Sequence, residues 1–325
     1  MAITLEQAKR GMADKVDQQI VDMFRRSSLL LDQMPFDNAI CPGTGGSTLT
    51  YGYIQLTTPS TASVRTINNE YTPGEAKKEK KTTSAIIMGG SFEVDRVLQN
   101  TAGAADELAF QAEQKIKATA NYFHNLVING SSQSTDAGFE ANTFDGLRKL
   151  LNMTQNELTS QVSLTTSAEL DTNYNAFLDE MDGFISTLDG APSMLLMNRE
   201  MLVKLRSIAR RAGYYERTKD DFGRVVETYA GIPMVDMGSY YDGADTKEVV
   251  ATDKTGKTAI YAVSLGLDGF HGISPQGTGV ITSYMPDLNA PGAVKTGEVE
   301  LVAGVALKNT LKAAVLKDIA IKAGA

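Results

Sequence analysis

The stretch AADELAFQAEQKIKATANYFHNLVI, residues 104–128, decides the fold. Its apolar side chains recur at three- and four-residue spacing and mark one face of a helix: Ala105, Leu108, Ala112, Ile116, Phe123 and Leu126. No proline interrupts the pattern, and Asn129 and Gly130 follow it as a stop signal. At 1.5 Å per residue the pattern predicts a helix about 35–40 Å long. A helix of this length organises the elements on both sides of it.

The segment before this helix, residues 47–95, is polar and rich in β-prone residues. Two β-prone arms, residues 47–57 and 82–94, flank a polar connection of roughly 25 residues that contains Pro59 and Pro73. This pattern predicts an extended β-hairpin that leaves the body of the protein. Such a long polar connection does not fit a compact domain unless it has a function of its own.

A run of lysines lies in this polar connection: Lys77, Lys78, Lys80 and Lys81. One interpretation is a solvated loop tip. The other is a cationic surface that docks onto an acidic patch of a neighbouring copy of the chain.

The N-terminal segment begins with a capping-box pattern, Thr4 to Gln7. Apolar residues then follow at helical spacing and predict an amphipathic helix of about twenty residues: Leu5, Ala8, Met12, Val16, Ile20 and Met23. Its apolar stripe packs either on its own domain or on another subunit.

The segment after the long helix alternates between helical and β-prone patterns, which indicates an α/β region. A short helix is expected over 144–151, followed by longer helices over 174–188 and 199–211, the last ended by Gly213. β-prone runs are found at 193–197, 225–229, 232–235, 249–252 and 259–263. In the tail, residues 298–322, two apolar arms predict a terminal antiparallel pair of strands.

Composition narrows the classes of protein that the chain can represent. Of its 325 residues 42% are apolar, which is enough to bury a core, and the formal net charge is −8. This acidity argues against a nucleic-acid-binding surface, because Lys and Arg make the phosphate contacts. Cys41 is the single cysteine, so no intrachain disulfide is expected. Without a secretory pattern or a membrane-spanning run, the chain is expected to stay in the cytosol of the producing cell, away from membranes.

No grouping of residues indicates catalysis. The two histidines, His124 and His271, are far apart in sequence, and no zinc-binding or phosphate-binding motif occurs. The carboxylates at 179–182 and 220–221 fall where a solvated surface is expected. We therefore expect no catalytic residue, no cofactor and no metal.

The order of these elements resembles that of the major capsid proteins of tailed bacteriophages, a fold shared with herpesvirus shells and encapsulins. The stretches that carry the resemblance are FRRSSLLL (24–31), GGSTLTYGY (45–53), SFEVDRV (91–97), FDGLRKL (144–150), MNR (197–199) and AGIPMV (230–235). Each is short, and the specificity lies in their order along nearly the whole chain.

The resemblance implies an α+β fold of five parts. These are an N-terminal arm (1–46), an extended β-hairpin loop (47–95), a peripheral domain with a spine helix (96–150), an α/β axial domain (151–290) and C-terminal strands that return to the peripheral domain (291–325).

The resemblance also implies a function. The subunit would assemble with itself into hexamers and pentamers of an icosahedral shell, in the host cytoplasm, and become part of the virion. A separate scaffolding protein and a portal are expected, and the shell would enclose double-stranded DNA without sequence-specific binding. The candidates for intersubunit contact are Leu5, Met12, Ile20 and Phe24 of the arm and Lys77, Lys78, Lys80 and Lys81 of the loop.

Three alternatives remain open from the sequence. An encapsulin-type nanocompartment would have the same fold with a protein cargo. An enzyme such as a hydrolase with a long lid loop would purify as a small oligomer with turnover. A tail-tube protein would form tubes in place of closed shells.

Overall fold

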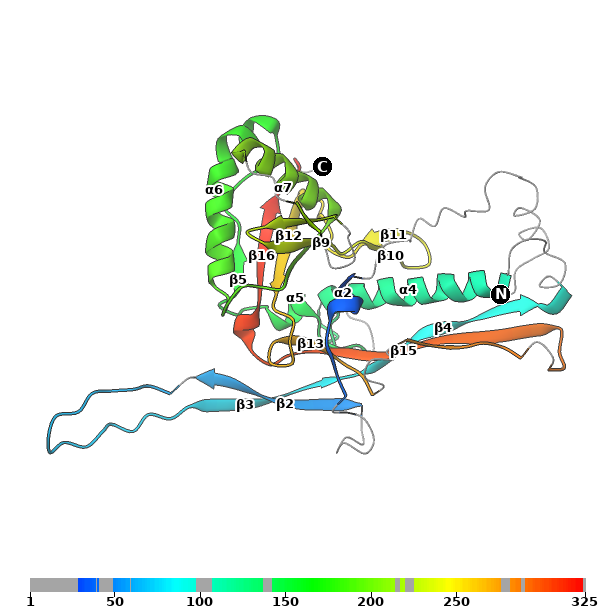
Figure 1. The fold of residues 1–325 in the computed structure, drawn as a ribbon, viewed down its shortest axis with the longest axis horizontal. Coiled ribbons are helices and arrows are strands. Elements are labelled where there is room, and N and C mark those ends of the chain that lie inside the picture. The colour runs from blue at the N-terminus through cyan, green and yellow to red at the C-terminus, as the bar shows by residue number, and fades with distance from the viewer. Residues whose placement is uncertain are drawn as a thin grey trace.

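A computed structural model describes residues 29–38, 40, 49–58, 60–97, 107–136, 142–213, 217–219, 225–275, 281–287 and 290–323. The molecule has three parts that lie in different directions: a long sheet with one helix along it, a second sheet covered by two helices, and a narrow two-stranded ribbon (Figure 1). The N-terminal arm candidates Leu5, Met12, Ile20 and Phe24 lie outside the described residues.

The long helix predicted from 104–128 is α4, Glu107–Asn129. It lies along a five-stranded sheet in which β15 (Val294–Leu307) pairs with β4 (Ile86–Asp95), β13 (Phe270–Ile273) and β14 (Ile281–Tyr284), and β13 also pairs with β1 (Phe36–Asp37) (Figure 1). Side chains of β4 and β15 alternate between buried and exposed over the outer half of the pair. This period of two turns one face of the pair toward α4 and leaves the other face open.

The second sheet has seven strands in the order β5-β16-β12-β6-β9-β8-β7. Their bounds are Glu157–Thr159 (β5), Ala313–Ala320 (β16), Lys257–Val263 (β12), Met194–Met197 (β6), Ile232–Asp236 (β9), Val225–Tyr229 (β8) and Arg217–Lys219 (β7). Helices α6 (Ser167–Ser186) and α7 (Arg199–Ala212) cover one face.

Strand β12 packs on both faces, against helices α6 and α7 on one side and against the end of α4 on the other. Ile260 and Ala262 pack with Phe177 and other side chains of α6 and α7, whereas Tyr261 and Val263 belong to the core that includes the end of α4. Both faces of the strand are therefore buried, as its apolar sequence favours.

The remaining described elements are short. They are α2 (Leu29–Gln33), α5 (Leu147–Leu150), the 3-10 turn η1 (Thr310–Lys312), and the hairpin of β10 (Ser239–Tyr241) and β11 (Thr246–Glu248).

Two local predictions were wrong. Residues 249–252 are not a strand; β10 and β11 form a hairpin just before them. The two tail arms do not pair with each other, because β15 lies in the five-stranded sheet and β16 pairs with β12 and β5 in the other. Both arms are strands, but their partners come from distant parts of the chain.

Candidate assembly interface

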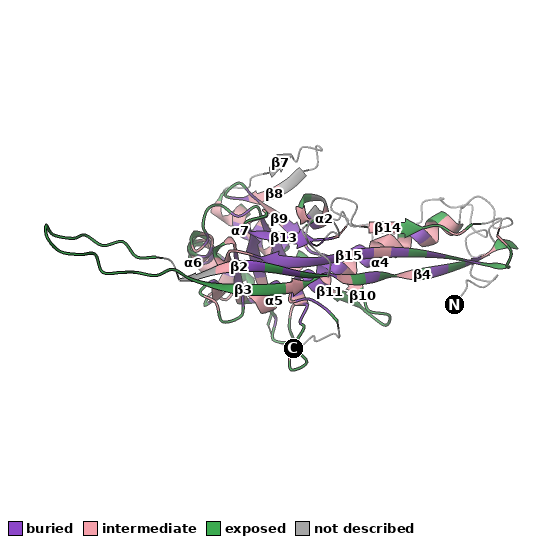
Figure 2. Ribbon diagram, turned by 90° about the horizontal axis from the view of Figure 1, so that it is seen from below, coloured by how far each residue is buried: buried purple, intermediate pink, exposed green. Residues whose placement is uncertain are grey.

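The ribbon projects from the base of the long sheet and consists of β2 (Thr50–Thr58) and β3 (Lys77–Ser84) (Figure 1). Residues 60–76 form its tip, have no regular secondary structure and are all exposed (Figure 2). This confirms an extended β-hairpin, with different limits from those expected. The second arm ends at Ser84, and residues 86–95 belong to β4 in the long sheet.

The two faces of the ribbon differ. Tyr51 and Tyr53 point inward and are buried against Ala306 and Ile273 at the base of the sheet. Gln55, the next residue on this face, donates a hydrogen bond to the carbonyl oxygen of Leu307 at 3.4 Å. The inward face therefore seats the ribbon on the body.

The outward face carries two of the predicted lysines. Lys80 lies opposite Ile54 in the ladder, and Lys78 lies opposite Leu56. Since alternate residues share a face, these two lysines and the exposed Ile54 form one outward strip.

The lysine run therefore lies in strand β3 and not in the loop tip. Lys81 forms an ion pair with Glu79 at 3.2 Å on the inward-pointing side, and Lys77 begins the strand. Among the described residues, no carboxylate lies within ion-pair distance of Lys78 or Lys80.

A second surface, on the long sheet, has the opposite charge. Glu298 and Glu300 are on the face of β15 that points away from α4, while Val299 and Leu301 between and after them are buried. Glu93 of β4 is exposed on the same face, as are the large apolar side chains Ile87 and Tyr284. We call the surface formed by Glu93, Glu298, Glu300, Ile87 and Tyr284 the acidic face.

Sequence reasoning missed the acidic face, although its signal was present. The period-two pattern of Val299, Leu301 and Ala303 places Glu298 and Glu300 together on the opposite side of the strand. The pattern within β15 does not reveal that β4 pairs with it, and this pairing adds Glu93 to the acidic face.

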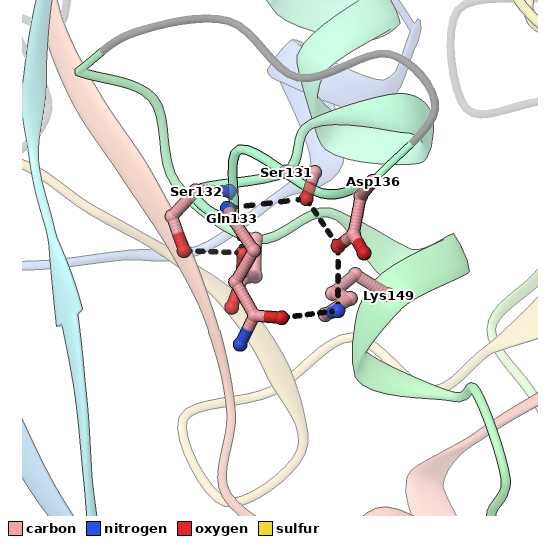
Figure 3. Close-up of polar contacts among 6 residues, drawn as sticks. Ser131, Ser132, Gln133, Asp136 and Lys149 are labelled. Atoms are coloured by element: carbon pink, nitrogen blue, oxygen red, sulfur yellow. Dashed lines mark hydrogen bonds and ion pairs between the residues drawn. The ribbon is translucent and has the colours of Figure 1, made fainter.

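A cavity of about 500 Å³ lies where the end of α4 meets α5 and the seven-stranded sheet. On its wall Lys149 of α5 forms an ion pair with Asp136 at 2.5 Å and a hydrogen bond with Gln133 at 3.0 Å (Figure 3). Ser131 donates a hydrogen bond to Asp136 at 2.7 Å, and together with Lys149 it holds the pKa of that carboxyl below its usual value. This network joins residues 131–136, which follow α4, to α5.

Of the carboxylates considered in the sequence, Asp220 and Asp221 lie outside the described residues, and two of the three in α6 accept hydrogen bonds. Glu180 accepts hydrogen bonds from Ser160 Oγ at 2.6 Å and from the backbone N–H of Gln161 at 2.9 Å, and Asp182 accepts one from Tyr229 at 2.7 Å. Asp179 is exposed. In the part of the chain that the structure describes, no group of three or more His, Cys, Asp or Glu side chains is arranged to hold a metal ion, and no helix is long and apolar enough to cross a membrane.

The model of the family described as SU10 major capsid protein matches residues 10–232, which is more than half of the chain. The chain belongs to this family. It is thus a major capsid protein, a structural subunit of the head shell of a tailed bacteriophage, as the resemblance implied. No curated protein matches the chain in sequence.

Solved structures confirm the fold. The encapsulin SrpI from Synechococcus elongatus PCC 7942, solved as a holo complex, superposes with a TM-score of 0.65 at 14% identity, covering 98% of this chain and 97% of that one. The capsid of Myoviridae phage XM1 has a TM-score of 0.58 at 13% identity, covering 95% and 98%. Mycobacterium phage Bobi has a TM-score of 0.59 at 12% identity, covering 97% of each chain. These likenesses confirm the predicted α+β capsid fold.

Proposed function

We propose that the chain assembles into hexamers and pentamers of an icosahedral head that encloses double-stranded DNA, with the ribbon as the clasp between neighbouring subunits. The proposal includes assembly in the host cytoplasm with a separate scaffolding protein and a portal. The observation that carries the clasp is a ribbon with an exposed tip, residues 60–76, and an outward face on which the described side chains Ile54, Lys78 and Lys80 are exposed.

The tip of the ribbon supports this proposal because it exposes apolar side chains far from the body. Val64 is fully exposed, Ile67 is 89% exposed, and Tyr71 is held by the Arg65 guanidinium at 5.4 Å from its ring. Apolar groups in such positions gain stability when another surface removes them from water. A second copy of the chain supplies that surface in a shell.

The charges of the ribbon indicate where it docks. Lys78 and Lys80 are two residues apart on one strand, and Glu298 and Glu300 are two residues apart on another. Both pairs therefore repeat at roughly 6.5–7 Å. We propose that the outward strip of one subunit lies on the acidic face of the next, with Ile54 facing the apolar side chains there. Such complementarity fixes register and partner choice more than affinity.

The division into five parts remains a proposal, with one adjustment. Residues 86–95 are assigned to the peripheral part, because β4 pairs along β15 from Ile86 to Asp95. The arm residues Leu5, Met12, Ile20 and Phe24 remain proposed contacts to neighbouring subunits.

Negative-stain electron microscopy of the expressed protein tests the function. Closed shells, or rings of five and six subunits, are the expected result, whereas small particles under all assembly conditions would contradict it. A variant in which residues 60–76 are replaced by an Asn-Gly turn keeps the β2–β3 pairing and should fold without forming shells. A variant with Val64, Ile67 and Tyr71 changed to Ser isolates the apolar contribution of the tip.

An encapsulin-type compartment is the alternative, because the SrpI likeness concerns the fold. Particles isolated from the producing cell distinguish the two. Nuclease-protected double-stranded DNA supports the phage head, and a co-purifying protein cargo without DNA supports the compartment.

A further inference from the structure

The base of the ribbon is held by a junction around His271. His271 lies in β13 and is fully buried between β15, where it pairs with Ala306, and β1, which runs alongside as the parallel neighbour of β13. The ring of Tyr51, from β2, meets the imidazole edge-on at 5.9 Å between ring centroids. Four strands from two distant stretches of the chain, residues 36–58 and 270–307, thus meet at one imidazole.

The hydrogen bonds of this imidazole define its protonation. Nδ1 lies 3.2 Å from the carbonyl oxygen of Gly269, which accepts a hydrogen bond only if Nδ1 carries the proton. Nε2 is buried and has no hydrogen-bond partner among the described residues. The neutral ring therefore fits this site, whereas a protonated ring would place a second N–H and a charge where the described part of the chain supplies no acceptor.

The charged groups around the junction oppose one another. Asp37 of β1 and Asp268 before β13 favour the protonated imidazole, and Lys308 after β15 disfavours it. Lys308 lies 3.8 Å from Asp37 and 5.6 Å from the centre of the Tyr51 ring. Asp37 also accepts the Tyr51 hydroxyl hydrogen bond at 2.8 Å. Burial outweighs the hydrogen bond to the Gly269 carbonyl oxygen and both carboxylates and, with Lys308, lowers the pKa of His271 below its usual value.

We propose that His271 is a proton-sensitive seat for the ribbon: the neutral ring holds Tyr51 and the base of β2 on the body, and protonation releases them. This regulation rests on the proposed function of the ribbon as the intersubunit clasp. Release would let the clasp change its angle while the five-stranded sheet stays folded.

The direction of the pH dependence follows from linkage. In the released state His271 is solvated and has the ordinary pKa of about 6.5. In the seated state its pKa is lower. Acidification below about pH 6.5 therefore favours release, by up to about tenfold in the equilibrium for each pH unit until the pH reaches the seated pKa.

The test measures hydrogen exchange of the β2 and β3 amides in the unassembled full-length chain at pH 7.5 and pH 5.0, with exchange times scaled for the intrinsic rate. In the native chain, protection of these amides should fall at least several-fold at pH 5.0 relative to that of α4. In the His271→Asn variant, whose amide can replace the Nδ1 donor, the pH effect should disappear.

The chain offers a matched control, because it has two histidines. His124 lies in α4, where burial lowers its pKa to about 4, and it is distant in sequence from the ribbon. The His124→Asn variant should keep the pH effect at the ribbon. A pH effect that persists in His271→Asn, or one that is absent in the native chain, would overturn the proposal.

A second measurement covers the case that His271→Asn does not fold. Nuclear magnetic resonance of histidine-labelled native chain resolves two imidazoles, and a pKa of His271 at or above 6.5 would also overturn the proposal. Both readouts concern the unassembled chain. If shells form normally without the ribbon tip, the proposed role of the ribbon between subunits is wrong. That result is distinguishable from a failure of the His271 proposal, which is tested in the unassembled chain.

Discussion

The hydroxyl of Tyr51 in β2 donates a hydrogen bond to the carboxylate of Asp37 in β1 at 2.8 Å. This bond joins the ribbon to strand β1. Asp37 also lies near Lys308 at the end of β15. Strand β1 and the ribbon therefore meet the body at the same place.

Removing this hydroxyl should weaken the seat. We expect Tyr51→Phe to lower the free energy of unfolding by about 1.5–3 kcal/mol, because a hydrogen bond to a charged group is lost. Urea unfolding followed by circular dichroism measures the change. Tyr241→Phe is the matched control, because the Tyr241 hydroxyl also has an acceptor, Gly243 O at 2.8 Å, but on an exposed side chain. The control should stay within about 0.5 kcal/mol.

Reversing the charge of the outward strip should prevent shells. Lys78→Glu with Lys80→Glu places four carboxylates against one another if the ribbon docks on Glu298 and Glu300, and like charges at close range oppose binding. Microscopy should then show folded subunits or small oligomers. Adding Glu298→Lys and Glu300→Lys to the same chain should restore shells.

A control for net charge accompanies this reversal. Lys254→Glu with Lys257→Glu changes the charge of the chain equally, at two exposed positions in the turn before β12 and at its first residue, and shells should form normally. If the four-site variant fails to assemble while the two-site reversal assembles, the proposed docking of the strip on the acidic face is wrong.

The elements predicted well from the sequence are those fixed by local pattern. Helix α4 follows from its uninterrupted apolar spacing, and α7 ends at Gly213, which adopts the left-handed conformation with φ of 79°. Strand β15 follows from the alternation around Val299 to Val305. In each case the signal lies within the segment itself.

The predictions that failed concern long-range pairing. Nothing in residues 313–320 specifies that β16 pairs with β12 and β5 rather than with the adjacent β15. The lysine-rich residues 77–81 have weak strand preference, but their ladder partners in β2 include Tyr53 and Ile54, and cross-strand packing overrides propensity. The junction at His271 is invisible in the sequence, because β1, β2, β13 and the end of β15 come together only in the fold.

Acid should weaken the start of α6 through Glu169. This carboxylate accepts hydrogen bonds from Ser163 Oγ at 3.0 Å and from the backbone N–H groups of Thr165 and Thr166 at 2.9 and 3.1 Å. Contacts from Thr165, Thr166 and Ser163 lower its pKa to about 2. A lowered pKa in the folded state stabilises the protein above the unfolded value of 4.5, and this stability is lost as the pH falls toward 2.

The measurement compares urea unfolding of the native chain and Glu169→Gln at pH 7 and pH 3. The variant should have a lower free energy of unfolding than the native chain at pH 7, and the difference between the two free energies should be smaller at pH 3. Asp179→Asn, on the exposed side of α6, removes the same charge and should show no such narrowing. An equal gap at both pH values would contradict the assigned role of Glu169.

The close pairing of β4 with β15 should depend on Gly89. Its φ of 153° lies in a region that L side chains rarely adopt, and a Cβ placed there would lie 1.9 Å from the carbonyl oxygen of Val299. Gly89→Ala should therefore force the two strands apart and lower the free energy of unfolding by about 3 kcal/mol or more. Gly183→Ala in α6 is the control, because a Cβ there meets no atom within 4 Å and Ala is more favourable than Gly in a helix by about 0.5–1 kcal/mol.

Since the acidic face needs Glu93 of β4 beside Glu298 and Glu300 of β15, Gly89→Ala should also reduce shell formation under conditions where the subunit remains folded. Thermal unfolding together with microscopy checks both effects, and a Gly89→Ala chain with native stability would show that the strands do not pair at this distance.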